Sequence, residues 1–321
     1  MLLGFPVVIL SLVLAAQANI AHGDRAVARH HARVSLPRAP LESSTLRRRK
    51  SCNVHTKSIS AVKTTSTHTT TKKTTTAAKK TTVAAQVKAT PVSNQAQAGT
   101  IKVSDTHCGS SGATTQTTST TGPNGALSWM NCGIESGGWN PPHVEVKNLV
   151  SVDLKTSLKD PNSPFAACAK YVAYFYQYAD EYGLEAIMLA AFALQESSCN
   201  PETVGGGGEQ GLMQITKDKC GGAPGGNCRD PSFNIKTGAA YFAGVLRDNG
   251  GNVLAAVGEY NGWAPGLTKA KATAARYSEC CTCQNNLDYL HQYFNGWLQG
   301  KNAYALHLGK YFNLDVCPDK N

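Results

Sequence analysis

The chain has 321 residues and a formal net charge of +10 at pH 7. The positive charge lies in the first third, where residues 1–107 hold 16 Lys+Arg against 3 Asp+Glu, whereas residues 108–321 hold 15 against 18. The longer part shows no basic patch interleaved with aromatic residues, which excludes nucleic-acid recognition there. The basic part fits either adhesion to an anionic polymer or a solvated linker.

The first 18 residues have the features of a secretory signal peptide. Residues 2–16 form an apolar run too short to span a bilayer, and Ala16-Gln17-Ala18 has the small-x-small pattern of a cleavage site. A basic residue near the start, usual in such peptides, is missing. No other apolar run reaches transmembrane length, so we expect a secreted, extracellular protein without a membrane span.

Residues 19–125 are expected to be disordered. No aromatic residue occurs between Phe5 and Trp129, and residues 56–93 are dominated by Thr, Ser, Lys and Ala. Such a chain buries too little apolar area to offset its ordering entropy. The basic run at residues 47–50 fits a propeptide processing site or part of a solvated tail, and the Thr-rich part fits an O-glycosylated stalk.

From residue 126 onward the pattern predicts a mainly helical domain. Residues 126–162 contain Trp129, Cys132 and Trp139 and indicate an irregular extension, in which Trp139 is either a structural anchor or a sugar-stacking site. The main domain, residues 163–321, begins at a helix-cap pattern, Ser163-Pro164. Apolar spacing predicts helices over 165–183, 186–196, 232–249, 253–259 and 286–298, with an irregular or hairpin region over 200–230.

Ten cysteines beyond residue 100 predict disulfides, because exported chains oxidise their cysteines. Cys220 and Cys228 flank a short loop and are expected to pair, and Cys199 is expected to hold the loop that follows it. Residues 280–283 superficially resemble a zinc knuckle, but no His or second C-x-x-C lies at ligand spacing, so no metal is expected. The ten are Cys108, Cys132, Cys168, Cys199, Cys220, Cys228, Cys280, Cys281, Cys283 and Cys317.

One carboxylate stands out at the end of the apolar run 186–196. Glu196 falls just before the helix-breaking pair Asn200-Pro201. The negative end of the helix macrodipole and the apolar surroundings both disfavour its charge. A raised pKa suits a general acid, although an ordinary surface glutamate at a helix end remains the alternative.

Four sequence blocks follow one another beyond this point. They are Glu196-Ser197, the GLMQ of 211–214, Asn234 with the GAAYF of 238–242, and the EYNG of 259–262. Their order, and the 18 residues from Glu196 to Gln214, resemble the soluble-type lytic transglycosylases (SLT domains), glycoside hydrolase family 23-like relatives of goose-type lysozymes. The resemblance covers about residues 163–300 and implies a lysozyme-like fold of the α+β class, mainly α.

The resemblance also implies a mechanism. Glu196 acts first as acid and then as base, the substrate's acetamido group assists at the anomeric carbon, and the 6-hydroxyl attacks to give a 1,6-anhydro product without a cofactor. Tyr260 is expected to hydrogen-bond the Glu196 carboxyl. The implied substrate-binding positions are Ser197, Met213, Gln214, Tyr260 and Asn261.

Three of these positions could instead have purely structural roles. Met213 fits the core, Asn261 a turn and helix cap, and Ser197 a support for the helix end. Tyr241 is expected in the core and is not counted as a site residue.

The sequence departs from the family pattern near the site. Gly205 stands where the family usually has a serine nine residues after the glutamate. Glu209 and Glu259 are candidates for a second carboxylate in direct, lysozyme-like hydrolysis.

We therefore expect a monomeric, secreted fungal enzyme that acts on bacterial peptidoglycan and is either free in the medium or attached to the cell wall. The alternatives are a hydrolase of chitin-like N-acetylglucosamine polymers and a non-catalytic glycan-binding wall protein.

Overall fold

The computed structural model describes residues 99–205 and 207–317. These residues belong to one of the two compact units into which the chain divides, and the other unit, residues 37–88, lies outside them. The expected signal peptide, processing site and Thr-rich stalk therefore also fall outside the described residues. Within the described ranges, every helix is too short or too polar to cross a membrane.

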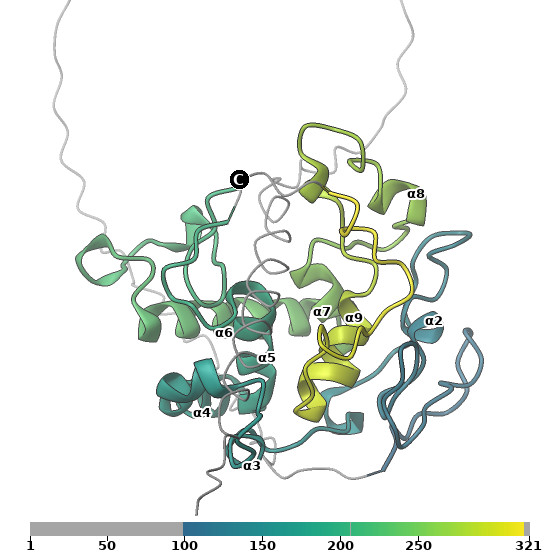
Figure 1. Ribbon diagram of the computed structural model, residues 1–321, viewed down its shortest axis with the longest axis horizontal. Helices are drawn as coiled ribbons and strands as arrows, with labels where there is room; N and C mark the ends of the chain where they lie inside the picture. The colour runs from purple at the N-terminus through teal and green to yellow at the C-terminus, as the bar shows by residue number, and fades with distance from the viewer. Residues whose placement is uncertain (1–98, 206, 318–321) are drawn as a thin grey trace, which may run out of the picture. The chain divides into compact units, whose positions relative to one another are not determined.

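The domain is mainly helical, as the sequence predicts (Figure 1). Its α-helices are α2 (Leu127–Met130), α3 (Leu154–Ser157), α4 (Val172–Tyr182), α5 (Ala186–Ser197), α6 (Pro231–Asp248), α7 (Val253–Tyr260), α8 (Lys269–Ala272) and α9 (Tyr289–His291). Short 3₁₀ turns span Val146–Asn148, Ala166–Tyr171, Lys217–Lys219, Pro224–Gly226, Cys281–Cys283 and Trp297–Gln299, and Gln292–Gly296 is a π turn. Extended structure among the described residues is confined to isolated bridges, Thr106 with Gly109, Val204 with Gln210 and Gln210 with Ile215.

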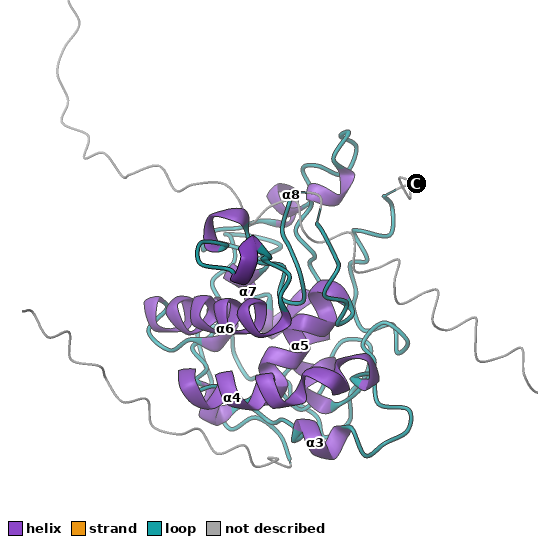
Figure 2. Cartoon of the chain, turned by 90° about the vertical axis from the view of Figure 1, so that its left-hand side faces the viewer, coloured by secondary structure: helices purple, strands orange, loops and turns teal. Residues whose placement is uncertain are grey.

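Helix α5 is the central helix of the domain. All its residues are buried, and it packs against α4 and α6, which also contact each other (Figure 2). A helix that is apolar on every side is stable only inside a core. Helix α5 ends in a left-handed turn at Ser198, where φ is 51°. Glu196, its penultimate residue, is therefore held inside the protein.

The helix boundaries follow local capping signals. Helix α6 begins at Pro231 after Asp230, whose side chain accepts the Phe233 N–H at 2.9 Å, and α7 begins after Asn252, which caps it in the same way. The helices predicted over 232–249 and 253–259 are confirmed within a residue or so at each end.

Two other predicted helices are interrupted. The one expected over 165–183 starts as the 3₁₀ turn Ala166–Tyr171, and the one over 286–298 is divided among α9, the π turn and a 3₁₀ turn. Tertiary hydrogen bonds accompany the second break: in the π turn, Asn295 donates to the Gly125 carbonyl at 2.8 Å and accepts the Asn124 N–H at 2.8 Å.

The expectation of disorder up to residue 125 is wrong for residues 99–125. Ile101 joins the hydrophobic core, and Asn124 donates to the carbonyls of Val150 and Phe294 at 2.8 and 2.7 Å. The disulfide Cys108–Cys132 also ties this segment to the domain. Buried hydrogen bonds and a covalent link thus order a segment that has little apolar surface of its own.

The neighbouring extension is held by Trp139. This side chain is 1% exposed, donates from Nε1 to the Met130 carbonyl at 3.0 Å and packs edge-to-face on Trp263 at 4.9 Å between ring centroids. Trp139 is therefore a structural anchor, and the sugar-stacking alternative does not hold.

The ten predicted cysteines form five disulfides. The expected Cys220–Cys228 pair is confirmed, and Cys199 bonds to Cys168. The cluster at 280–283 is oxidised rather than arranged for zinc. The remaining bridges are Cys108–Cys132, Cys280–Cys283 and Cys281–Cys317.

Candidate active site

Glu196 has the environment of a general acid. Its side chain is 4% exposed, and the Tyr289 hydroxyl of α9 donates to its Oε1 at 2.6 Å. Burial raises the pKa of Glu196 to about 8, although the hydrogen bond from Tyr289 opposes the rise. The raised pKa expected from the sequence is confirmed, so the carboxyl carries its proton at neutral pH.

Aromatic rings create the low polarity around this carboxyl. Phe192, one helical turn before Glu196, stacks on Tyr260 of α7 at 4.1 Å between centroids. It also contacts Phe242 of α6 at 4.8 Å and Tyr293 at 4.7 Å. Rings from four segments that are distant in sequence thus pack together one helical turn before Glu196, whose carboxyl is desolvated by burial.

The two candidates for a second carboxylate lie in different surroundings. Glu209 is fully buried, accepts the Gly207 N–H at 3.0 Å, and its negative charge contributes to the raised pKa of Glu196. Glu259 is half-buried on α7 and accepts a hydrogen bond from Asn249, at the end of α6, at 2.9 Å. Of the two, Glu209 is the one whose charge acts on Glu196.

The four sequence blocks converge on the segment 211–214. Ser197 Oγ lies 2.8 Å from the Leu212 carbonyl and also 2.8 Å from that of Ala193, one turn earlier in its own helix. Asn234 Oδ1 accepts the Met213 N–H at 2.7 Å, and the Tyr260 hydroxyl donates to the Met213 carbonyl at 2.8 Å. One role of these blocks is therefore to hold this segment beside Glu196.

Two glycines of the blocks are required by close approach. A Cβ atom at Gly211, where φ is 77°, would lie 2.4 Å from Asn234 Nδ2. A Cβ atom at Gly238 would lie 2.7 Å from that of Met213. The Met213 side chain is fully buried against α6, which supports the core alternative and contradicts the expectation that it lines the cleft.

Gln214 lies beside Glu196 in a strained conformation. Its φ of 46° is left-handed, and its Nε2 donates to the carbonyls of Gly211 and Thr203 at 2.8 and 3.0 Å. Its buried Oε1 finds no hydrogen-bond partner among the described residues. The Nε2 end of the amide is thus fixed by two hydrogen bonds, whereas its Oε1 end can still accept one from a ligand.

A cavity of about 310 Å³, a volume that includes its opening to solvent, lies over Glu196. The sequence predicts three of its lining residues and misses the rest. The lining consists of Glu196, Gln214, Ile215, Thr216, Lys219, Tyr241 and Tyr260.

The structure answers the expectations about four single residues. Tyr241 is half-buried and packs against the core as expected, but it also lines the cavity. The Tyr260 hydroxyl donates its hydrogen bond to the Met213 carbonyl, and the hydroxyl that donates to Glu196 is that of Tyr289. The hydrogen bonds of Ser197 support the helix end, which agrees with its structural alternative. Asn261 is absent from the cavity lining and follows α7 as its C-cap.

The backbone after Glu196 is strained and covalently tied. Ser198 and Cys199 both have left-handed conformations, with φ of 51° and 57°. Such conformations are costly for residues other than glycine and persist where the surrounding structure imposes them. The Cys168–Cys199 bridge is such a constraint, and it fixes the end of α5.

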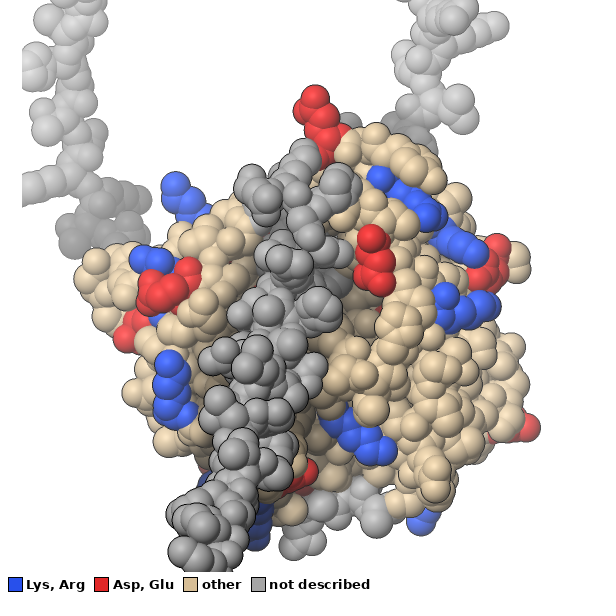
Figure 3. Space-filling model, viewed as in Figure 1, with Lys and Arg blue, Asp and Glu red and all other residues tan. Residues whose placement is uncertain are grey.

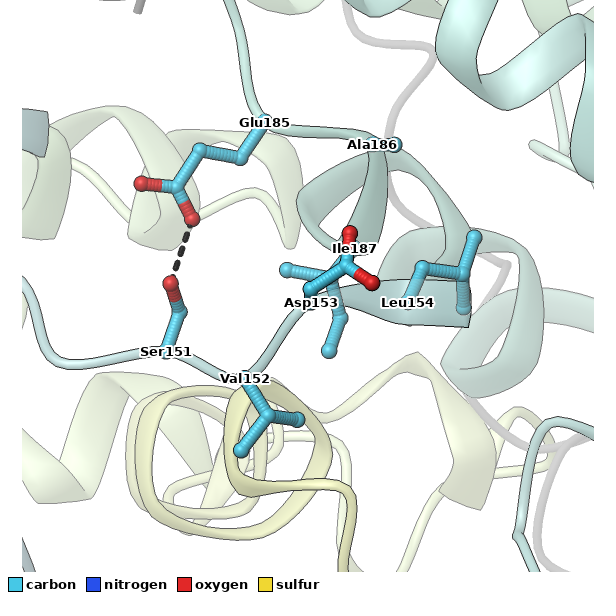
Figure 4. A pocket seen from close by; sticks show the side chains of 7 residues that line it. All are labelled: Ser151, Val152, Asp153, Leu154, Glu185, Ala186 and Ile187. Carbon is cyan, nitrogen blue, oxygen red and sulfur yellow. Dashed lines mark hydrogen bonds between the residues drawn. The ribbon is translucent and has the colours of Figure 1, made fainter. Parts of the chain in front are cut away.

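A second, smaller cavity lies at the opposite end of α5 (Figure 4). There Ser151 Oγ donates to Glu185 Oε2 at 2.6 Å, and burial raises the pKa of Glu185. Its lining residues include none of those that surround Glu196.

One cluster has metal-ligand residue types, namely His107, Cys108 and Cys132. Both cysteines are joined in a disulfide, so their sulfurs are not available as thiolate ligands.

Comparison with known proteins finds similarity to one family over part of the described domain. Residues 155–279 match the family model described as "Transglycosylase SLT domain". A "Membrane-bound lytic murein transglycosylase F 1" of Alkalilimnicola ehrlichii is 36% identical over 77 residues, 24% of this chain and 16% of the relative. A "Membrane-bound lytic murein transglycosylase C" of Yersinia enterocolitica is 31% identical over 122 residues, 32% of this chain and 34% of the relative.

Among solved structures, the lytic transglycosylase Slt of Pseudomonas aeruginosa, an inactive mutant, matches with 21% identity and a TM-score of 0.31. The match covers 46% of this chain and 24% of that one. This chain spans about a third or less of the length of the two curated relatives. The family model matches over residues that include all four sequence blocks, so this part of the chain is similar to the transglycosylase SLT domain.

Proposed function

We propose that this protein is a secreted enzyme that cleaves the β-1,4 bonds between N-acetylmuramic acid and N-acetylglucosamine in bacterial peptidoglycan. The observation that carries the proposal is a single glutamic acid, Glu196, which is buried, carries its proton at neutral pH and lines an open cavity. The SLT domain match and the two murein transglycosylase relatives support this substrate class. The apolar N-terminal run and the five disulfides support secretion.

In the proposed reaction, Glu196 gives its proton to the glycosidic oxygen as the bond to the anomeric carbon breaks. The acetamido oxygen of the same sugar stabilises the positive charge that develops at that carbon. The Glu196 carboxylate then removes the proton of the 6-hydroxyl, whose oxygen attacks the anomeric carbon and forms the 1,6-anhydro ring. Glu196 is thereby protonated again, and no water is consumed.

The surroundings of Glu196 suit both halves of this cycle. The aromatic environment favours the protonated acid, whereas the Tyr289 hydroxyl stabilises the carboxylate formed when the proton leaves. The Gln214 Oε1 acceptor lacks a partner among the described residues, and an N–H or O–H of the sugar would supply one.

Direct hydrolysis is the second candidate, because Glu209 acts electrostatically on Glu196. In that case Glu209 would activate a water molecule and the product would have a reducing end. The same chemistry would allow cleavage of neutral N-acetylglucosamine polymers.

The test is digestion of purified bacterial peptidoglycan with the full chain, beside Glu196→Gln, followed by mass spectrometry of the fragments. Fragments lighter by one water than hydrolysis products, absent with Glu196→Gln, are the expected result. Fragments with reducing ends would instead indicate direct hydrolysis, with Glu209 as the carboxylate that activates water. Cleavage of chitin oligomers alone, or of neither polymer, would refute the proposal.

A further inference from the structure

One cavity residue has no role in the proposed reaction. Lys219 is the last residue of the 3₁₀ turn Lys217–Lys219 and the only cationic side chain among the residues that line the cavity over Glu196. Its Nζ donates to Thr216 Oγ1 at 2.7 Å and lies 4.7 Å from the centre of the Tyr241 ring. All three side chains line the cavity.

Local structure holds this ammonium in place. In a 3₁₀ turn, side chains three residues apart are eclipsed, which brings Thr216 and Lys219 together. The next residue, Cys220, is fixed by its disulfide to Cys228. The Lys219 side chain is 24% exposed, against 49% for Lys236, a lysine of α6 that also lies over a tyrosine ring.

The described residues leave the Lys219 ammonium with a weak ion pair and an N–H donor to spare. Asp218 is the carboxylate paired with it, at 3.3 Å, and its side chain is 74% exposed, so the pair is weak and screened. An ammonium has three N–H donors, of which the described residues accept two, Thr216 and Asp218. Glu196 is uncharged at neutral pH, so the charge lining the cavity is positive.

We propose that Lys219 binds a carboxylate of the glycan substrate and thereby makes the cavity select carboxylate-bearing peptidoglycan over neutral N-acetylglucosamine polymers. This inference rests on the proposed function, because it assigns the substrate preference of the same cavity. The face of the Tyr241 ring lies against the ammonium and helps to hold it in the cavity, where it can meet an anionic group of the sugar. A cation there gains nothing from a neutral chitin chain, whereas a carboxylate forms a charge-assisted hydrogen bond.

Peptidoglycan offers this carboxylate from two sources. One is the lactyl group of muramic acid, which is free where the stem peptide has been removed. The other is the stem peptide itself, when the lactyl group is bound as an amide. Strands of each kind distinguish the two sources.

The test measures binding by titration calorimetry in the Glu196→Gln chain, so that turnover is not required. The ligands are soluble glycan strands without peptides, strands with peptides, and each preparation after its carboxyls have been capped as methylamides. Lys219→Met removes the charge, Lys219→Arg keeps it, and Lys236→Met is the matched control on a tyrosine ring outside the cavity.

We expect Lys219→Met to weaken binding of uncapped strands by roughly tenfold to a hundredfold, the range for a hydrogen bond to a charged group. Binding of capped strands should not change, and Lys219→Arg and Lys236→Met should bind like the parent. A loss of binding on strands without peptides would assign the carboxylate to the lactyl group, and a loss on strands with peptides would assign it to the stem peptide.

Equal loss on capped and uncapped strands, or no loss on either, would overturn the assignment of Lys219. So would an absence of strand binding by the parent chain. Failure of the proposed function is a separate result, namely that the wild-type chain releases no fragments from peptidoglycan whatever its binding preference.

Discussion

Replacement of Tyr289 by phenylalanine tests the description of the acid most directly. The change removes one oxygen and with it the hydrogen bond to Glu196 Oε1, and it leaves the ring in the core. This hydrogen bond stabilises the charged carboxylate and lowers its pKa, so its loss must raise the pKa of Glu196 further above 8.

The size of the effect follows from the strength of such a bond. A hydrogen bond to a charged group contributes about 1.5–3 kcal/mol, and 1.36 kcal/mol corresponds to one pKa unit. The neutral acid also accepts this hydrogen bond, but more weakly, and the pKa depends only on the difference between the two protonation states. We therefore expect the pKa of Glu196 to rise by about one unit. Since the protonated form starts the reaction, the alkaline limb of the rate profile should move to higher pH by the same amount.

The assay is kcat/KM on soluble peptidoglycan strands from pH 5 to 10, together with a carbon NMR titration of the glutamate carboxyls assigned with Glu196→Gln. Tyr293→Phe is the matched control. The Tyr293 ring stacks on that of Tyr289 at 6.5 Å, but its hydroxyl donates to the Met188 carbonyl at 2.9 Å.

The control should lose about 1 kcal/mol of stability with little change in the pKa of Glu196. An unchanged or lowered pKa in Tyr289→Phe, or an equal rise in Tyr293→Phe, would refute the assignment of Tyr289 as the residue that tunes the acid.

Three further predictions concern the same region. Glu196→Gln should stabilise the fold, because a pKa raised from 4.5 to about 8 penalises folding increasingly as pH rises between these values. The expected gain in the free energy of unfolding is on the order of 3 kcal/mol at pH 7 and near zero at pH 4. Thermal unfolding at both pH values measures it. Glu209→Gln should lower the pKa of Glu196 and move the alkaline limb of the rate profile to lower pH, and complete loss of turnover would instead indicate a second catalytic carboxylate. Replacing Cys168 and Cys199 together by alanine opens a bridge between residues 31 apart and should cost about 3–4 kcal/mol in denaturant unfolding; an unchanged unfolding midpoint with full turnover would show that the bridge does not fix the end of α5.

The distribution of charge supports a selective cavity rather than general adhesion by the domain surface. On the face shown in Figure 3, basic and acidic side chains are interspersed among a larger number of uncharged residues. The excess of positive charge lies in residues 1–107, most of which fall outside the described residues.

The sequence by itself determined the features that depend on neighbours along the chain. The apolar run 186–196 predicts a buried helix because its periodicity is local, and its apolar character also predicts the raised pKa of Glu196, whose cause in the structure is burial. The Cys220–Cys228 pair is predictable because the loop between them is short. The four sequence blocks likewise identify the domain before any distance is known.

Only the tertiary structure decided which side chains meet. Tyr289 is 93 residues from Glu196, and no spacing rule selects it over Tyr260, whose hydroxyl turns to the Met213 carbonyl. The family resemblance implied that Met213 lines the cleft, but Gly238 leaves space for its side chain in the core. Local patterns specify elements and their ends, whereas the partner of a side chain depends on how distant segments pack, which the order of residues in one segment does not contain.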